Sequence, residues 1–135
     1  SKSDENPMNY IALLDDPDTI TRKLRKAVMD STRGITYEPK ARPGVANLLT
    51  IYGALTDMTP KAVAHKYADK GNAELKNDLT EVVIEFLRPF QQRYHELMDD
   101  KGFLLQVLRR GADQARERAE PTLRNVQKAL GFLPE

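Results

Sequence analysis

The chain has 135 residues and a formal net charge of +1, with 40% hydrophobic and 30% charged residues. This length and balance fit a single soluble domain and exclude an intrinsically disordered chain. Because the chain contains no cysteine, disulfides, thiolate metal sites and a cysteine nucleophile are excluded as well. No apolar run is long enough to cross a bilayer, so we expect no membrane partner.

The amino terminus is a polar loop, Ser1-Lys2-Ser3-Asp4-Glu5-Asn6-Pro7, without an initiating methionine. We therefore expect Ser1 to mark a cut in a longer chain. A first helix is predicted from Pro17, because Asp16 is a good cap and proline fits the first helical position. Its predicted buried face consists of Ile20, Leu24, Ala27 and Val28, and its predicted solvated face of Arg22, Lys23, Arg25 and Lys26.

The segment 21–43 is strongly basic and is expected to be irregular after the first helix. It contains only two acidic residues, Asp30 and Glu38. Its basic residues are Arg22, Lys23, Arg25, Lys26, Arg33, Lys40 and Arg42. Ile35 to Tyr37 predicts at most an extended loop, and Pro39 and Pro43-Gly44 favour irregular backbone. A second helix is then predicted over 45–55, followed by a shorter helix that Thr59 caps and that stops near Gly71.

The longest pattern predicts a central helix over 78–99, which other helices must cover. Its apolar residues recur in steps of three and four, with Asn77 or Asp78 as the cap, a kink at Pro89, and an end at Gly102. A last pattern over 104–130 keeps its phase across Pro121. We interpret it as one kinked helix whose alanines allow close packing, with two helices as the alternative. The predicted fold is all-α, a bundle of about five helices with kinked central and C-terminal helices.

The helical part of the chain carries no recognisable catalytic motif. His65 and His95 lack further ligands at metal-binding spacing beyond the pair His95 and Asp99, so we interpret both as structural and predict no metal site. No glycine-rich phosphate loop and no nucleophile elbow is present. A lysine between two serines on a polar loop can bind phosphates, but Ser1-Lys2-Ser3 alone is a weak signal.

The surrounding sequence makes that signal specific. Ser1-Lys2-Ser3, Asn6-Pro7 and LLDDPDTITRKLRKAVMDS together resemble the end of the Lys-Met-Ser-Lys-Ser loop and the following helix of class I aminoacyl-tRNA synthetases. The segments ARPGVANLLTIYGALTD, VVIEFLRPFQQRY and RAEPTLRNVQKALGF resemble the tryptophanyl-tRNA synthetase family of bacteria. The resemblance covers essentially the whole chain.

The resemblance implies a C-terminal fragment of a tryptophan-tRNA ligase, with residues 1–16 as the second half of the ATP loop and 17–135 as a helical anticodon-binding domain. Lys2 would be the catalytic lysine, and Ser1, Lys2 and Ser3 would bind ATP, which comes with Mg²⁺. In the full enzyme, tryptophan attacks the α-phosphate of ATP, and the tryptophanyl group is then transferred to tRNA(Trp). We expect the isolated chain to be inactive and its helical domain to bind no cofactor.

The same resemblance implies a cytoplasmic homodimer whose nucleic-acid partner is tRNA rather than DNA. Arg22, Arg25 and Lys26 share one face of the first helix and are candidate tRNA contacts. Arg109 and Arg116 are candidates on the last helix, with Arg124, Arg110 and Lys128 nearby. Solvated helix faces remain the alternative interpretation of both groups, especially on the last helix.

Two other interpretations of the whole chain stay open at this point. The first is the equivalent region of tyrosyl-tRNA synthetase, which shares the architecture. The second is a stand-alone helical interaction or tRNA-binding module, which would leave Ser1-Lys2-Ser3 without a purpose.

Overall fold

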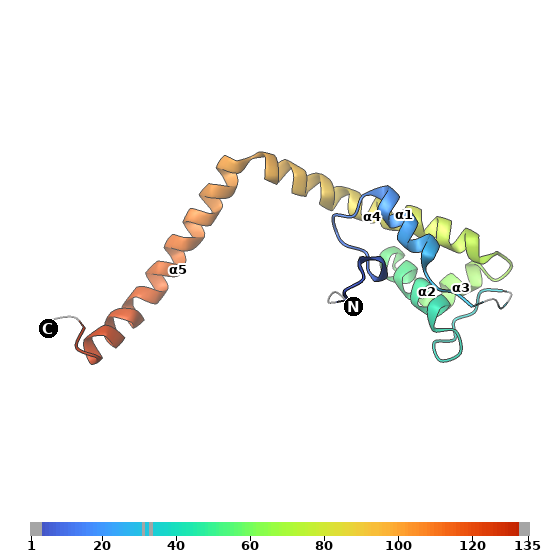
Figure 1. Ribbon diagram of the computed structural model, residues 1–135, viewed down its shortest axis with the longest axis horizontal. Coiled ribbons are helices and arrows are strands. Elements are labelled where there is room, and N and C mark those ends of the chain that lie inside the picture. The colour runs from blue at the N-terminus through green and yellow to red at the C-terminus, as the bar shows by residue number, and fades with distance from the viewer. Residues whose placement is uncertain (1–3, 31, 33, 133–135) are drawn as a thin grey trace. The chain divides into compact units, whose positions relative to one another are not determined.

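The computed structural model describes residues 4–30, 32 and 34–132 of the chain. The described residues form a short 3-10 helix, η1, and five α-helices, with no strand among them (Figure 1). The predicted all-α fold is therefore confirmed. The elements in chain order are η1 (Pro7–Asn9), α1 (Pro17–Lys26), α2 (Pro43–Thr56), α3 (Pro60–Lys66), α4 (Asn72–Asp99) and α5 (Lys101–Ala129).

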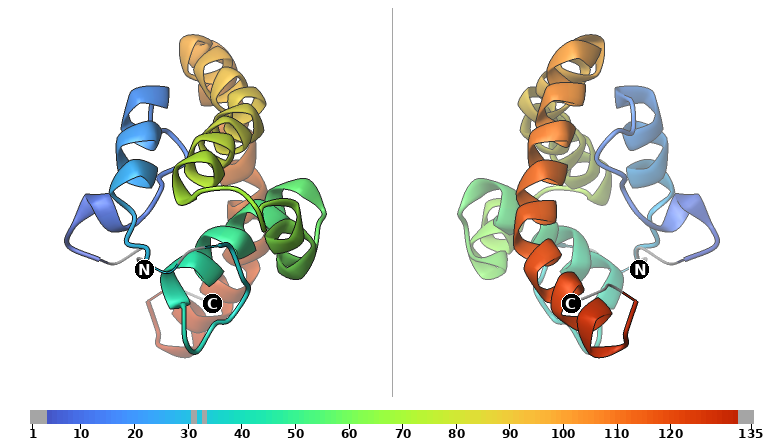
Figure 2. Two further views of the ribbon diagram at one scale, coloured as in Figure 1. Left: turned by 90° about the vertical axis from the view of Figure 1, so that its right-hand side faces the viewer. Right: turned by 90° about the vertical axis from the view of Figure 1, so that its left-hand side faces the viewer.

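The chain divides into two compact units, which are described separately. Unit 1 is Ser1–Gln92 and contains α1 to α3 and most of α4, whereas unit 2 is Arg93–Glu135 and contains the end of α4 and α5. In unit 1, α1 lies on one side of the first half of α4 and α3 lies on the other, in both views of Figure 2. The helices α2 and α3 pack against each other.

The start of α1 and the start of α3 agree with the sequence prediction. The Asp16 side chain accepts a hydrogen bond from the Thr19 N–H at 2.7 Å, and Thr59 accepts one from the Ala62 N–H at 3.2 Å. Proline occupies the first position of both helices. The same rule explains why the predicted irregular segment ends earlier than expected: α2 begins at Pro43, so Pro43-Gly44 is helical and not loop.

The predicted start of the central helix was wrong, whereas its predicted last residue, Asp99, is confirmed. The helix α4 begins at Asn72 and not at Asp78, because the fully buried Leu75 extends the apolar stripe by one turn. Asp78 is consequently an interior residue of α4. At the other end, Asp100 accepts a hydrogen bond from the Phe103 N–H at 2.9 Å and caps α5. Gly102 therefore lies in the first turn of α5 and does not terminate α4.

The core of unit 1 draws on α1 to α4 and the loop between α1 and α2. From α4 it takes Leu75, Leu79, Val83 and Leu87, which are spaced by four residues. The other buried core residues are Ile20, Leu24, Ile35, Val45, Leu48, Leu49, Tyr52, Val63, Ala64 and Tyr67. One predicted core residue of α1 is missing: Val28 is exposed, because α1 ends at Lys26.

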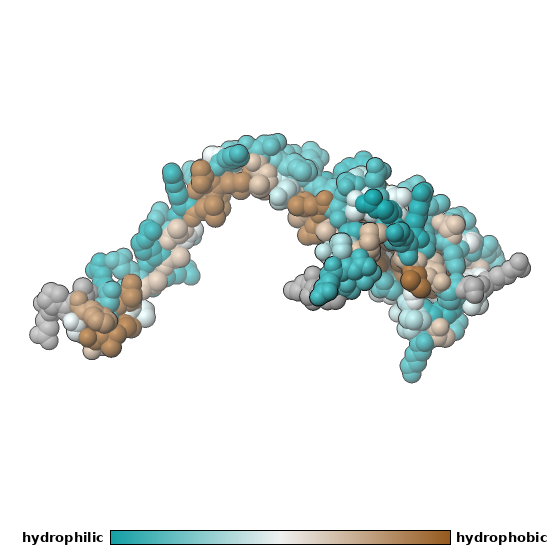
Figure 3. All heavy atoms as spheres, viewed as in Figure 1, coloured by the Kyte–Doolittle hydropathy of each residue, from teal (hydrophilic) through white to brown (hydrophobic). Residues whose placement is uncertain are grey.

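The last helix is a single element that continues through Pro121, as the preferred interpretation predicted. None of its described residues is buried. Exposed apolar surface is seen toward each end of this helix (Figure 3). The exposed apolar residues include Phe103, Leu105, Val107 and Leu108 toward its start and Leu123 and Val126 toward its end, with Leu130 directly after it. The predicted close packing of its alanines is therefore not seen within unit 2.

Candidate nucleic-acid interface

The structure fixes α1 at both of its ends. Asp16 caps the amino end, and the Lys76 ammonium from α4 donates hydrogen bonds to the carbonyl oxygens of Arg25 and Ala27 at 2.9 and 2.7 Å. A positive charge at this end is favourable, because the carbonyls of a last helical turn point at it. Burial lowers the pKa of the Lys76 ammonium. The orientation of α1 on unit 1 is thus held by a contact that the sequence pattern did not reveal.

One member of the predicted solvated face of α1 is buried. Lys23 is 7% exposed and forms an ion pair with Asp15 at 2.5 Å, and its ammonium lies 5.2 Å from the ring centre of Tyr10. The segment before α1 folds over this side of the helix. The Gln91 amide holds that segment by donating to the carbonyl oxygens of Leu13 and Asp15 at 2.9 Å. Lys23 is therefore a structural residue.

The three remaining basic residues of α1 form an exposed row. Arg22, Arg25 and Lys26 follow at steps of three and one, which places them on one side of the helix. Arg22 donates to the Thr19 hydroxyl at 3.2 Å, and no carboxylate of the described residues forms an ion pair with any of the three. Three unneutralised cations on a rigid helix are a suitable surface for a phosphate backbone.

Arg42 is the second basic residue of the segment 21–43 that is buried and therefore not available for binding a partner. Its side chain is 7% exposed and donates to Asp30, to the Thr36 hydroxyl, and to the carbonyl oxygens of Thr32 and Gly34. All of its donor nitrogens are thus engaged in holding the loop between α1 and α2. Arg33 lies outside the described residues, and Lys40 is exposed.

The basic residues of α5 are exposed but partly neutralised. Arg116 pairs with Asp113 at 2.8 Å, and Arg124 pairs with Glu120 at 2.7 Å, each within one turn of the helix. Arg109 has no ion-pair partner among the described residues. The structure therefore leaves Arg109 as a free cation and Arg116 as a paired one, which makes this strip electrostatically weaker than the α1 row.

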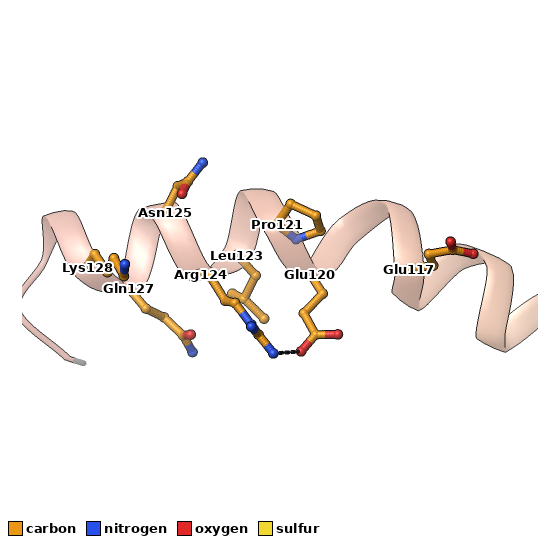
Figure 4. A pocket seen from close by; sticks show the side chains of 8 residues that line it. All are labelled: Glu117, Glu120, Pro121, Leu123, Arg124, Asn125, Gln127 and Lys128. Carbon is orange, nitrogen blue, oxygen red and sulfur yellow. Dashed lines mark hydrogen bonds and ion pairs between the residues drawn. The ribbon is translucent and has the colours of Figure 1, made fainter. Parts of the chain in front are cut away.

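A hollow of about 890 Å³ lies on α5 around Pro121, and all eight lining residues come from that helix. Figure 4 shows these side chains pointing to several sides of the helix, with the ion pair of Arg124 and Glu120 as a dashed line. No lining residue comes from a second element. The hollow is thus an open surface of α5 and does not bring the site candidates together.

Sequence reasoning missed a second hollow, of about 600 Å³, between η1, the end of α1 and the start of α2. Lys26 lines it, together with three asparagines, Asn6, Asn9 and Asn47. Asparagines in and next to turns are expected in any chain, so their type and spacing gave no signal. Their convergence depends on how η1 and α2 pack against α1.

Ser1, Lys2 and Ser3, which the sequence predicts to be ATP-binding and catalytic, lie outside the described residues. His65 and His95 are exposed, and the described residues contain no group of three potential metal ligands. In the same residues, no helix is both long and apolar enough to cross a membrane.

Comparison with known proteins shows to which family the chain is similar. Residues 1–88 match the family model for tRNA synthetases class I (W and Y). The chain is 44% identical to tryptophan–tRNA ligase 1 of Streptomyces coelicolor over 98% of its own length and 39% of that protein. It is 40% identical to tryptophan–tRNA ligase of Clostridium perfringens, over 99% of this chain and 40% of that protein.

A solved structure is similar over the same extent. The crystal structure of tryptophanyl-tRNA synthetase from Mycoplasma pneumoniae superimposes with a TM-score of 0.73 and 28% sequence identity, over 97% of this chain and 40% of that chain. The chain therefore spans about 40% of the length of the relatives that it matches.

Proposed function

Since the chain belongs to the tRNA synthetases class I (W and Y), we propose that it is the C-terminal part of a tryptophan-tRNA ligase. The observation that carries the proposal is the near-complete coverage of the chain by relatives named as tryptophan–tRNA ligases, at 38 to 44% identity. The whole enzyme would activate tryptophan with ATP and Mg²⁺ and transfer it to tRNA(Trp). It would work in the cytoplasm as a homodimer.

In this proposal the chain contributes two regions. Residues 1–16 supply the second half of the ATP loop and its connection, and 17–135 supply the helical tRNA-binding domain. The row of Arg22, Arg25 and Lys26 supports the second role, because its cations are exposed, rigidly held and unneutralised by the described carboxylates. Arg109 and Arg116 on α5 would add weaker contacts.

Lys2 would act on the activation step through electrostatics. The tryptophan carboxylate attacks the α-phosphorus of ATP, the bond to the bridging oxygen breaks, and pyrophosphate leaves with the additional negative charge. An ammonium group beside the β- and γ-phosphates stabilises that charge without transferring a proton. Ser1 and Ser3 would donate neutral hydrogen bonds to the same phosphates.

The tyrosine enzyme remains the alternative, because the matched family model covers both specificities. A stand-alone helical module is less well supported, since the family match includes the loop residues at the amino end. The names of the relatives favour tryptophan over tyrosine.

The test uses the full-length protein that contains this chain. We expect tryptophan, and not tyrosine, to support exchange of labelled pyrophosphate into ATP, and we expect a tRNA(Trp) transcript to be charged. Exchange with tyrosine alone would establish the alternative. A full-length protein that activates neither amino acid would contradict the proposed function.

A further inference from the structure

The hollow of about 600 Å³ lies wholly within unit 1, where three elements meet. Asn6 and Asn9 come from η1 and its cap, Lys23 and Lys26 come from α1, and Gly44 and Asn47 come from α2. Its volume falls in the range of small-ligand sites, about 300 to 1,000 Å³.

The polar lining of this hollow carries positive charge and amide groups that can both donate and accept, and it contains no carboxylate. It comprises two lysines and three asparagines. Two of these residues are already engaged: Lys23 pairs with Asp15, and the Asn9 amide donates to Asp4 at 3.1 Å. The Lys26 ammonium, the Asn47 side chain and the Asn6 amide nitrogen have no partner among the described residues. A lining with a free cation, free amides and no acid favours an anionic ligand.

The packing of α1 and α2 shapes the wall of the hollow. A Cβ atom at Gly44 would collide with the carbonyl oxygen of Val28, so glycine allows the first turn of α2 to approach the end of α1 this closely. Arg42 precedes this turn without capping it, because its guanidinium is engaged with Asp30. The first turn of α2, whose N–H groups have no partner within the helix, therefore borders the hollow at Pro43 and Gly44.

We propose that this hollow binds a phosphate group, with Lys26 as the cation and Asn47 and Asn6 as neutral donors. The proposal rests on the proposed function, which gives two sources for such a group: the backbone of a bound tRNA, or a nucleotide. It gives Lys26 a role that differs from that of Arg22 and Arg25, since Lys26 lines the hollow and they do not. In the sequence, Asn6 follows the predicted catalytic Lys2 by four residues.

The first test titrates the ¹⁵N-labelled chain with inorganic phosphate while potassium chloride keeps the ionic strength constant. We expect saturable shifts confined to the backbone amides of Gly44 and Asn47 and to the asparagine side-chain amides. Lys26→Met and Asn47→Asp should lose this response, the second because a carboxylate of the same size repels the anion. The matched control is Lys61→Met, which removes an exposed lysine of α3 and should respond as the unaltered chain does.

The result that overturns the proposal is a non-saturable or diffuse response, or one that Lys26→Met and Asn47→Asp leave unchanged. The unaltered spectrum of each variant outside the hollow shows that the variant is folded. Asn47→Asp is nearly isosteric and lies on an exposed part of α2, so it keeps the test available if Lys26→Met perturbs α1.

The second test identifies the source of the phosphate in the full-length protein. The dissociation constants of a tRNA(Trp) transcript and of ATP are measured separately for the unaltered protein and for Asn47→Asp. A rise of about tenfold for tRNA alone assigns the hollow to a backbone phosphate, and a rise for ATP alone assigns it to a nucleotide. No rise for either ligand would contradict the inference. The proposed function is judged separately, by tryptophan activation in the unaltered protein.

Discussion

Arg42 binds Asp30 through one edge of its guanidinium group, with the Arg42 Nε lying 2.9 Å and the Nη2 lying 2.8 Å from the two carboxylate oxygens. The hydrogen bonds from Arg42 lower the pKa of Asp30 from 3.8 to about 2. Because the other Arg42 donors hold Thr32, Gly34 and Thr36, this pair connects the end of α1 to the start of α2.

The pair predicts a loss of stability in acid. The lowered pKa of Asp30 means that the ionised form is favoured in the folded state, so its contribution is present above about pH 4 and is lost as the pH falls toward 2. We expect the unfolding midpoints of the unaltered chain and of Asp30→Asn to differ at pH 6 and to converge in this window. Thermal unfolding at a series of pH values measures the difference. A constant difference down to pH 2 would mean that the ion pair contributes nothing that depends on charge.

Tyr67→Phe tests the buried polar network between α2, α3 and α4. The Tyr67 hydroxyl donates to Asp78 at 2.6 Å and contacts the Tyr52 hydroxyl at 3.2 Å, and burial raises the pKa of Tyr67. Its removal leaves Asp78 without this donor, so we expect a loss of about 1 to 2 kcal/mol in the free energy of unfolding by urea. Tyr94→Phe is the control, because the Tyr94 hydroxyl has no hydrogen bond among the described residues. Equal losses in both variants would count against the network.

Gly53→Ala tests a close approach between α2 and the turn that follows it. A Cβ atom at position 53 would collide with the carbonyl oxygen of Met58, and the Gly53 carbonyl also accepts the Met58 N–H at 3.0 Å. The backbone must shift to admit the methyl group, so we expect a loss of about 1 to 3 kcal/mol. Gly71→Ala, which meets no atom within 4 Å, should change stability by less than about 0.5 kcal/mol. If Gly53→Ala left the free energy of unfolding unchanged, the turn after α2 would be able to shift without a loss of stability.

The basic row of α1 predicts a specific dependence of tRNA binding on salt. Replacing Arg22, Arg25 and Lys26 by glutamine in the full-length protein should reduce the slope of log K against log salt by about 2 to 3, because each lost phosphate contact removes about 0.7 to 0.9. The control replaces three exposed cations outside α1, Lys40, Lys61 and Arg88. An unchanged slope would show that the three residues belong to a solvated helix face and do not contact tRNA phosphates. An equal decrease in the control would indicate a general charge effect.

Lys2→Ala should slow adenylate formation in the full-length protein by about 100-fold or more, while tryptophan binding changes little. The physical reason is that the lysine stabilises charge that develops only as pyrophosphate leaves. Rapid-quench measurement of adenylate gives the rate, and equilibrium binding gives the affinity. Lys2→Arg retains the positive charge and should recover part of the rate. A variant without lysine that activates tryptophan at the normal rate would remove Lys2 from the mechanism.

The sequence predicted the helices of unit 1 where local chemistry decides their ends. Asp16-Pro17 and Thr59-Pro60 place a capping oxygen and a fixed φ angle side by side, which is sufficient to begin a helix. It failed at Asn72 and Asp100, because the start of α4 depends on the burial of Leu75, and Asp100 acts as a cap only after the chain leaves α4. The exposed cations Arg22, Arg25 and Lys26 were predicted as a group, since their spacing alone puts them on one side of a helix.

The amino-acid sequence by itself determined the all-α fold, the helix-forming segments and the family resemblance, because periodicity, caps and motif residues are properties of neighbouring positions. Only the tertiary structure decided which basic residues are available. Lys23 and Arg42 look like their exposed neighbours in the sequence, but in the folded chain both are buried and pair with carboxylates, Lys23 with Asp15 and Arg42 with Asp30. The convergence of Lys26 with Asn6 and Asn47 was decided in the same way. Such contacts arise between segments that the chain brings together only on folding, so no local pattern records them.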